Sequence, residues 1–185
     1  MPNHLSAVFL DRDGTLNVKA PKGSYISSPQ QLRLLPGAAQ AIRRLNDLGV
    51  PVYIVTNQRG VALGCLTREE VDAVNDALQD RLLRKGAHVD GIYVCPHDNG
   101  ACTCRKPLPG LLLQAAAEHN GLSLVRSVMI GDSESDIGAA AAVGARPIRL
   151  GRPGAASRAP VVLPDLGTAV ASLIDGLRGM NVGSR

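Results

Sequence analysis

Short apolar runs alternate with longer helical patterns along most of the chain, and this alternation limits the possible folds more than any other feature. The runs expected to form strands cover residues 7–11, 50–57, 91–96, 127–133 and 145–151. Helices are expected between them, at residues 36–49, 66–86, 108–121 and 135–144. Such alternation predicts right-handed crossovers and an α/β fold with a doubly wound, mostly parallel, Rossmann-like sheet.

Thr67 and Glu70 give one of these helices a clear start. Their spacing of three residues is that of a capping box. The expected tail comprises a surface loop, a small edge strand and a closing helix, at residues 152–160, 161–166 and 167–179. No internal repeat or domain boundary is visible, and no large insertion interrupts the pattern. A single domain spanning residues 1–185, without a large cap domain, is therefore expected.

The composition excludes several classes of protein. Hydrophobic residues make up 45% and charged residues 19% of the 185 residues, which is typical of a globular protein. Aromatic residues make up only 2%, so the stacking platforms of a single-strand nucleic-acid binder are missing. The first residues do not have the pattern of a signal peptide, and no apolar run is long enough to span a membrane. We expect a cytoplasmic protein, monomeric, with no nucleic-acid or membrane partner. The net charge of +4 favours an anionic small molecule.

Polar motifs follow four of the expected strands. They read DRDGT, TNQRG, CRKP and GDSESD. Because ligands bind beyond the carboxyl ends of strands in open α/β sheets, these motifs should meet at one edge. Asp11 and Asp13 are two residues apart, and close carboxylates require either a shared proton or a cation. Asp132 would complete an oxygen-rich site that suits Mg²⁺ better than Zn²⁺.

These groups can perform phosphoryl transfer. With Mg²⁺ present, one of the two aspartates can attack phosphorus and the other can act as general acid and base. Thr56 offers a hydroxyl to a phosphate oxygen, and Lys106 offers a positive charge. DRDG alone could equally be a turn with solvated charges. The joint occurrence of four motifs at strand ends argues against that alternative.

Residues 95–107, CPHDNGACTCRKP, contain a second candidate site. Cys95, His97, Cys102 and Cys104 form two ligand pairs on a short loop, a pattern that favours one tetrahedral Zn²⁺. The alternatives are a disulfide, which would not persist in a reducing cytoplasm, and cysteines that are merely packed. Four protein ligands fill the zinc shell, so the metal would be structural and would brace the loop that ends in CRKP.

The four motifs FLDRDGTLN, VTNQRG, RKP and GDSESD resemble those of the haloacid dehalogenase superfamily of phosphotransferases. The resemblance implies that Asp11 is the nucleophile, forming an aspartyl-phosphate, and that Asp13 is the general acid and base. It also implies that Thr56 holds the phosphoryl group and that Lys106 stabilises its charge. The implied Mg²⁺ ligands, with Asp136 supporting their shell, are Asp11, the backbone carbonyl of Asp13, and Asp132.

Within that superfamily, the zinc loop resembles that of the D-glycero-D-manno-heptose 1,7-bisphosphate phosphatases and of the related histidinol-phosphate phosphatases. The first resemblance implies a hydrolase that removes the 7-phosphate and leaves heptose 1-phosphate, for the biosynthesis of nucleotide-activated heptose. It further implies substrate recognition by Arg105, together with Gly23, Ser24, Tyr25, Asn57, Gln58 and Arg59.

Several alternatives remain open on the sequence alone. The segment NVKAPKGSY is longer than the common form, in which an acidic residue often follows the Asn. Its Lys19 and Lys22 could reach a second phosphate, although each taken singly could be a solvated charge.

Histidinol phosphate is the nearest alternative substrate, and a phosphatase of nucleic-acid ends is disfavoured by the lack of aromatics. From a different class, a non-catalytic zinc-binding adaptor is opposed by the presence of both Asp11 and Asp13. The fourth cysteine, Cys65, is expected to be a free, packed thiol.

Overall fold

The structure, a computed structural model, describes residues 5–182 of the chain. Residues 1–4 and 183–185, which belong to the predicted single domain, lie outside this described part. The strands are β1 (Val8–Leu10), β2 (Val52–Asn57), β3 (Gly91–Cys95), β4 (Val128–Gly131), β5 (Arg146–Leu150) and β6 (Val162–Leu163). The helices are α1 (Ala38–Asn46), α2 (Arg68–Leu83), α3 (Gly110–Glu118), α4 (Glu134–Ala142) and α5 (Leu166–Val182), with a short 3₁₀ turn at Leu124–Arg126.

All strand pairs are parallel, and the six strands form one sheet in the order β3-β2-β1-β4-β5-β6. Within the sheet, β2 lies beside β1 in one direction, whereas β5 lies beside β4 in the opposite direction. The point where the order reverses therefore lies between β1 and β4. In doubly wound sheets the ligand crevice forms outside the carboxyl ends of the strands at this point. The expected fold class is confirmed.

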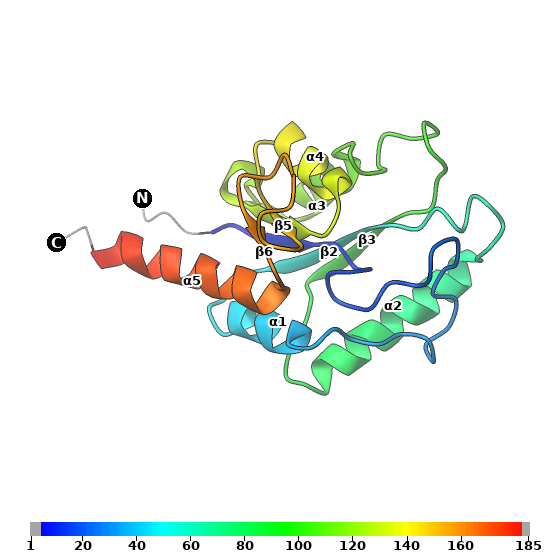
Figure 1. The fold of residues 1–185 in the computed structure, drawn as a ribbon, viewed down its shortest axis with the longest axis horizontal. Helices are drawn as coiled ribbons and strands as arrows, with labels where there is room; N and C mark the ends of the chain where they lie inside the picture. The colour runs from blue at the N-terminus through cyan, green and yellow to red at the C-terminus, as the bar shows by residue number, and fades with distance from the viewer. Residues whose placement is uncertain (1–4, 183–185) are drawn as a thin grey trace.

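The alternating side chains of β1 divide the core between the two faces of the sheet. Val8 and Leu10 pack into a cluster with residues of α1, α2 and α5. Phe9, between them, packs into a second cluster with residues of α3 and α4. Figure 1 shows α1, α2 and α5 below the sheet and α3 and α4 above it. Because β1 is buried on both faces, the residues that follow it are held at the sheet edge with little freedom.

The long connection after β1 lies against the same edge. Backbone hydrogen bonds join Leu35 to Leu16 and Val18 to Arg33, at 2.9 Å each. Arg81 of α2 donates to the carbonyl oxygens of Leu32 and of Pro29. The connection is thus a folded loop tied to α2.

Helix α2 begins as the sequence predicts. The Thr67 hydroxyl accepts from the backbone N–H of Glu70 at 3.1 Å, and the Glu70 carboxylate accepts from the backbone N–H of Thr67 at 2.7 Å. Together these two bonds confirm the capping box. Within the described part of the chain, none of the helices has the length and apolar character required to cross a membrane.

Candidate active site

Lys106 lies between two carboxylates at the carboxyl edge of the sheet. Its Nζ is 2.8 Å from Asp11 Oδ1 and 2.5 Å from Asp136 Oδ1, and it donates to the carbonyl oxygen of Val55 at 2.7 Å. Lys106 is only 3% exposed, and Asp136 is fully buried. Burial lowers the pKa of Lys106, but the two carboxylates outweigh it and raise that pKa above its ordinary value. The residue is therefore a permanent cation beside Asp11.

Asp11 follows β1, and its backbone N–H donates to the carbonyl oxygen of Ile130 in β4 at 3.0 Å. This bond fixes Asp11 at the point where the strand order reverses. Burial raises the pKa of the Asp11 carboxyl to about 7, and Lys106 opposes that shift. An additional cation beside Asp11 would favour the ionised carboxylate, which is the nucleophilic form.

Asp13 lies in a different environment from Asp11. Its carboxylate accepts from Arg12 Nη2 at 3.0 Å, from Asn17 Nδ2 at 2.8 Å and from Gln58 Nε2 at 2.8 Å. Burial raises the pKa of Asp13, but the Arg12 guanidinium and these hydrogen bonds lower it below its ordinary value. Arg12 is itself fully buried and donates through Nη1 to Asn75 Oδ1 of α2 at 2.9 Å. Two carboxylates two residues apart therefore have pKa values shifted in opposite directions.

The end of β2 supplies three polar side chains. The Thr56 hydroxyl accepts from Gln58 Nε2 at 2.9 Å, so the Gln58 amide connects Thr56 to Asp13. Asn57 forms a two-point contact with the backbone of Lys106. Its Nδ2 donates to the Lys106 carbonyl at 3.0 Å, and its Oδ1 accepts from the Lys106 N–H at 3.1 Å. The amides of Asn57 and Gln58 thus bond the expected catalytic residues.

Three carboxylates could hold a divalent cation. One oxygen each of Asp11, Asp132 and Asp136 lies within 4.8 Å of the others. Asp132 Oδ1 is buried and has no hydrogen-bond partner among the described residues. Its other oxygen, Oδ2, is 2.5 Å from Lys19 Nζ. Because Asp136 is paired with Lys106, Asp11 and Asp132 are left as ligands, which fits Mg²⁺, an ion that takes one or two carboxylates and completes its shell with water and substrate oxygens. This set contains Asp11 and Asp132 of the predicted ligands; the side chain of Asp13 is turned toward Arg12.

Two small cavities adjoin these groups. The first, of about 160 Å³, is lined by Asp11, Asp13, Lys19, Thr56, Asn57, Lys106, Asp132, Ser133 and Ser135. The second, of about 180 Å³, is lined by Asp13, Lys19, Ala20, Ser24, Tyr25, Ile26, Asn57 and Gln58. The expected catalytic residues therefore surround the first cavity. Four of the expected substrate residues, Ser24, Tyr25, Asn57 and Gln58, lie at the second.

The other expected substrate residues lie farther out. Among the described residues, the linings of these two cavities do not include Gly23, Arg59 or Arg105. Gly23 lies in an exposed turn beside Ser24 with a φ of +84°. Arg59 Nε is 2.5 Å from Asp98 Oδ1, and Arg105 Nε donates to Asn99 Oδ1 at 2.8 Å. Both arginines thus cross-link the loop between β3 and α3.

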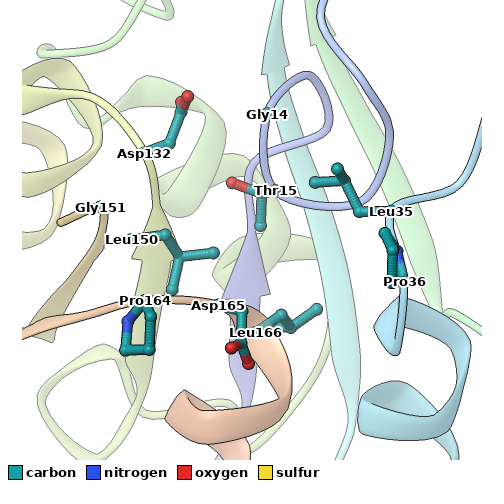
Figure 2. A pocket seen from close by; sticks show the side chains of 10 residues that line it. All are labelled: Gly14, Thr15, Leu35, Pro36, Asp132, Leu150, Gly151, Pro164, Asp165 and Leu166. Atoms are coloured by element: carbon teal, nitrogen blue, oxygen red, sulfur yellow. The ribbon is translucent and has the colours of Figure 1, made fainter.

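A third cavity of about 460 Å³ lies on the other side of Asp132 (Figure 2). Its walls come from the loop after β1, the entry to α1, the end of β5 and the start of α5. The Thr15 hydroxyl points into it and, though buried, has no hydrogen-bond partner among the described residues. Gly14 lies between this cavity and the carboxylates, with a φ of +92°, and a Cβ there would overlap Asp132.

The four predicted zinc ligands come together after β3. The Sγ atom of Cys102 is 3.6 Å from that of Cys95 and 3.4 Å from that of Cys104. His97 Nδ1 is 3.7 Å from Cys95 Sγ and 3.3 Å from Cys104 Sγ. A tetrahedron around Zn²⁺ with bonds of about 2.3 Å has edges of roughly 3.8 Å, so these separations fit a closed zinc site. The cluster could bind Zn²⁺ and leave no open position for a reactive water.

Burial and the neighbouring cysteines raise the pKa of the Cys104 thiol to about 12. Three adjacent thiolates are therefore unfavourable without a cation, and Zn²⁺ would supply the missing positive charge. By contrast, Cys65 is exposed, so its expected packing is wrong. It lies after Gly64 in the turns between β2 and α2, where the chain runs over the surface.

Three contacts of the site were missed by the sequence analysis. They are the Arg12–Asp13 pair, the Arg12–Asn75 bond and the Lys19–Asp132 pair. Arg12 is adjacent to Asp13, and an arginine between two aspartates that are expected to be catalytic could have been recognised as a charge partner. Asn75 and Asp132 are 63 and 113 positions from their partners, and nothing local in the sequence indicates those contacts.

Comparisons with known proteins agree on the family. A family model for haloacid dehalogenase-like hydrolases matches residues 8–144. A D-glycero-beta-D-manno-heptose-1,7-bisphosphate 7-phosphatase from Yersinia pestis is 37% identical over 164 residues, covering 83% of this chain and 85% of its own length. A D-glycero-alpha-D-manno-heptose-1,7-bisphosphate 7-phosphatase from Mycobacterium tuberculosis is 39% identical over 135 residues, covering 72% of this chain and 70% of its own.

A solved structure is similar over nearly its whole length. It is the D,D-heptose 1,7-bisphosphate phosphatase from B. bronchiseptica, complexed with magnesium and phosphate. It has a TM-score of 0.82 and 32% sequence identity, and the match covers 92% of this chain and 99% of that one. The described fold and the candidate magnesium carboxylates are consistent with this similarity.

The cysteine cluster makes a direct prediction about metal content. Elemental analysis of the purified chain should find about one tightly held Zn per molecule, because four ligands close the shell. Cys102→Ser removes one thiolate and should abolish tight binding and lower thermal stability, since the loop loses its brace. Cys65→Ser is the matched control, because that thiol lies outside the cluster, and should keep the metal. Equal zinc content in the two variants would contradict the assignment.

Proposed function

The chain belongs to the haloacid dehalogenase-like hydrolase family, and on this premise we propose that it removes the 7-phosphate of D-glycero-D-manno-heptose 1,7-bisphosphate and leaves heptose 1-phosphate. It is a phosphoric monoester hydrolase. The observation that carries the proposal is the buried Asp11–Lys106 pair at the floor of a cavity that also contains Asp13 and Thr56. The similar proteins named for this reaction, over most of the chain, support the choice of substrate.

In the proposed first step, a carboxylate oxygen of Asp11 attacks phosphorus. The bond between phosphorus and the sugar oxygen breaks, and Asp13 gives a proton to that oxygen. The pKa of Asp13 is lowered in the resting site, so it must take this proton up from solvent beforehand. Lys106 and Thr56 stabilise the charge on the transferring phosphoryl group. The product of this step is an acyl phosphate on Asp11.

In the second step, water attacks the phosphorus of the acyl phosphate and gives a proton to Asp13. The bond from phosphorus to Asp11 breaks, releasing inorganic phosphate and the Asp11 carboxylate. The contacts from Arg12, Asn17 and Gln58 favour the ionised form of Asp13, which is the form that can accept this proton.

Magnesium fits this site through Asp11 and Asp132, with the backbone carbonyl of Asp13 as a further proposed ligand and Asp136 beside them. Bound Mg²⁺ would neutralise charge on the phosphoryl oxygens. Lys106 stays paired with Asp136, so the protein retains one fixed cation at the site. The zinc cluster has the separate task of holding the segment that leads into Arg105 and Lys106.

We also propose that the chain acts as one domain, as a monomer in the cytoplasm, without a nucleic-acid or membrane partner. All six strands belong to one sheet, which supports a single folding unit. Three free cysteines in the zinc cluster favour a reducing compartment, because oxidation to a disulfide would remove metal ligands. The cavity beside Asp11, of about 160 Å³, suits a single phosphoryl group.

A substrate panel tests this function. With Mg²⁺, the chain should have a higher kcat/KM for either anomer of heptose 1,7-bisphosphate than for fructose 1,6-bisphosphate or histidinol phosphate. Asp11→Asn should lower kcat by at least about a thousandfold, because it removes the nucleophile. Retained fold and zinc content in that variant would exclude general damage. Faster turnover of histidinol phosphate would contradict the assigned substrate, and full activity of Asp11→Asn would contradict the chemistry.

Asn57 gives a second test, because its amide holds the Lys106 backbone. Asn57→Ala should lower kcat roughly tenfold to a hundredfold, since Lys106 and the phosphoryl group would no longer be aligned, with KM changed less than about threefold. Asn120→Ala changes an exposed asparagine after α3 and should leave both parameters unchanged. A rise in KM with kcat unchanged would instead make Asn57 a direct substrate contact.

A further inference from the structure

Lys19 lies at the boundary between the two small cavities of the site. The cavity around Asp11 and the cavity around Ser24 and Tyr25 share three lining residues, which are Asp13, Lys19 and Asn57. If the first cavity takes the reacting phosphoryl group, the second is where the part of the substrate that leaves would lie. A side chain shared by both cavities is therefore placed to contact the leaving group close to the bond that breaks.

The other two shared residues already have partners. The Asp13 carboxylate accepts from Arg12, and the Asn57 amide bonds the backbone of Lys106. Lys19 has one ion-pair partner, Asp132, and its side chain is 51% exposed. Among the described residues that line the second cavity, Lys19 supplies the cationic side chain. The charge offered to a leaving group is thus chiefly that of Lys19.

Lys19 is anchored at this place. Its Nζ lies 2.5 Å from Asp132 Oδ2. The approach depends on Gly14, because a Cβ at that position would overlap both Lys19 Cε and the Asp132 carboxylate. The φ of +92° at Gly14 is likewise unfavourable for other residues. An ammonium group held in this way can meet an anion with little loss of side-chain entropy.

Lys22, in the same loop, differs from Lys19. It is exposed, and the linings of the two cavities, as the described residues form them, do not include it. The sequence gives the two lysines equal standing as contacts for a second phosphate. In the structure only Lys19 of the two lines the cavities, so a variant of Lys22 can serve as the control for a variant of Lys19.

We propose that Lys19 selects substrates by the charge of the leaving group, favouring a leaving group with its own phosphate and disfavouring a cationic one. The proposal rests on the phosphatase function proposed above and names the residue that sets its substrate class. An ammonium–phosphate contact is a charge-assisted hydrogen bond, and such bonds are stronger than neutral ones. A leaving group that carries an ammonium, such as histidinol, would meet like charge at the same position.

The test compares substrates that share the reacting phosphate and differ in the remote group. Heptose 1,7-bisphosphate and heptose 7-phosphate form such a pair, and histidinol phosphate supplies the cationic leaving group. Lys19→Met should lower kcat/KM for the bisphosphate about tenfold, the effect of losing one hydrogen bond between charged groups. The fall in kcat/KM for heptose 7-phosphate should be several-fold smaller, so that the preference for the bisphosphate over the monophosphate drops. Lys19→Glu should lower kcat/KM for the bisphosphate further and raise kcat/KM for histidinol phosphate. Lys22→Met should leave kcat/KM for all three substrates unchanged.

Two results would overturn the proposal. An equal fall for the bisphosphate and the monophosphate in Lys19→Met would make Lys19 a positioning residue for Asp132. If Lys22→Met and Lys19→Met lowered kcat/KM for the bisphosphate equally, the effect would come from the net charge of the loop and not from a contact made by Lys19. If the wild-type chain hydrolyses neither heptose substrate, the proposed function fails, while Lys19 remains testable with fructose 1,6-bisphosphate against the two fructose monophosphates. In that series, an unchanged preference in Lys19→Met would also reject the charge selection.

Discussion

The Lys106 ammonium, buried between Asp11 and Asp136, is the interaction on which the rest of the site depends. Two carboxylates and one ammonium leave an excess negative charge in a place that water scarcely reaches. Buried charges are stable only when they are paired and hydrogen-bonded, so removing Lys106 would leave two buried carboxylates without a counter-charge. The remaining negative charge explains why the pKa of Asp11 is raised and why a divalent cation is welcome there. The same excess makes the centre attractive to Mg²⁺ and keeps Lys106 protonated.

Several separate features hold Lys106 in this position. Asn57 bonds its backbone from the end of β2, and the zinc cluster shapes the loop that leads to it from β3. That loop is also attached to β2 through the Arg59–Asp98 pair and through the bond from Gln58 N–H to the Cys95 carbonyl at 2.7 Å. A loop without regular secondary structure thus acquires a fixed course, and the chain achieves this without a large cap domain. Bound Zn²⁺ would act on the proposed catalysis through the geometry of the segment that leads into Arg105 and Lys106.

The sequence predicted the elements well because their signals are local. Apolar runs of strand length, the Thr67–Glu70 box and the paired zinc ligands each depend on residues close together in the chain, and all three appear in the structure. The proximity of Asp11 and Asp132 was also predicted, because ligand sites in open α/β sheets form at the carboxyl ends of the strands. The partners of the polar side chains were harder to predict from the sequence. Asn57 and Gln58 line the second cavity, and their amides also bond Lys106 and Asp13, because buried polar groups at a strand end take partners from distant elements. For the same reason, the bond from Arg12 to Asn75 could not be predicted.

Locating the phosphoryl group during turnover would show whether Asp11 is the nucleophile. Heptose bisphosphate labelled at the 7-phosphate would be mixed with the chain and Mg²⁺, quenched in acid within one turnover, and mapped by peptide. We expect transient label on the peptide that contains Asp11, appearing before inorganic phosphate and absent in Asp11→Asn. Label on a different residue, or release of labelled phosphate with no protein-bound label at any time, would contradict Asp11 as the nucleophile.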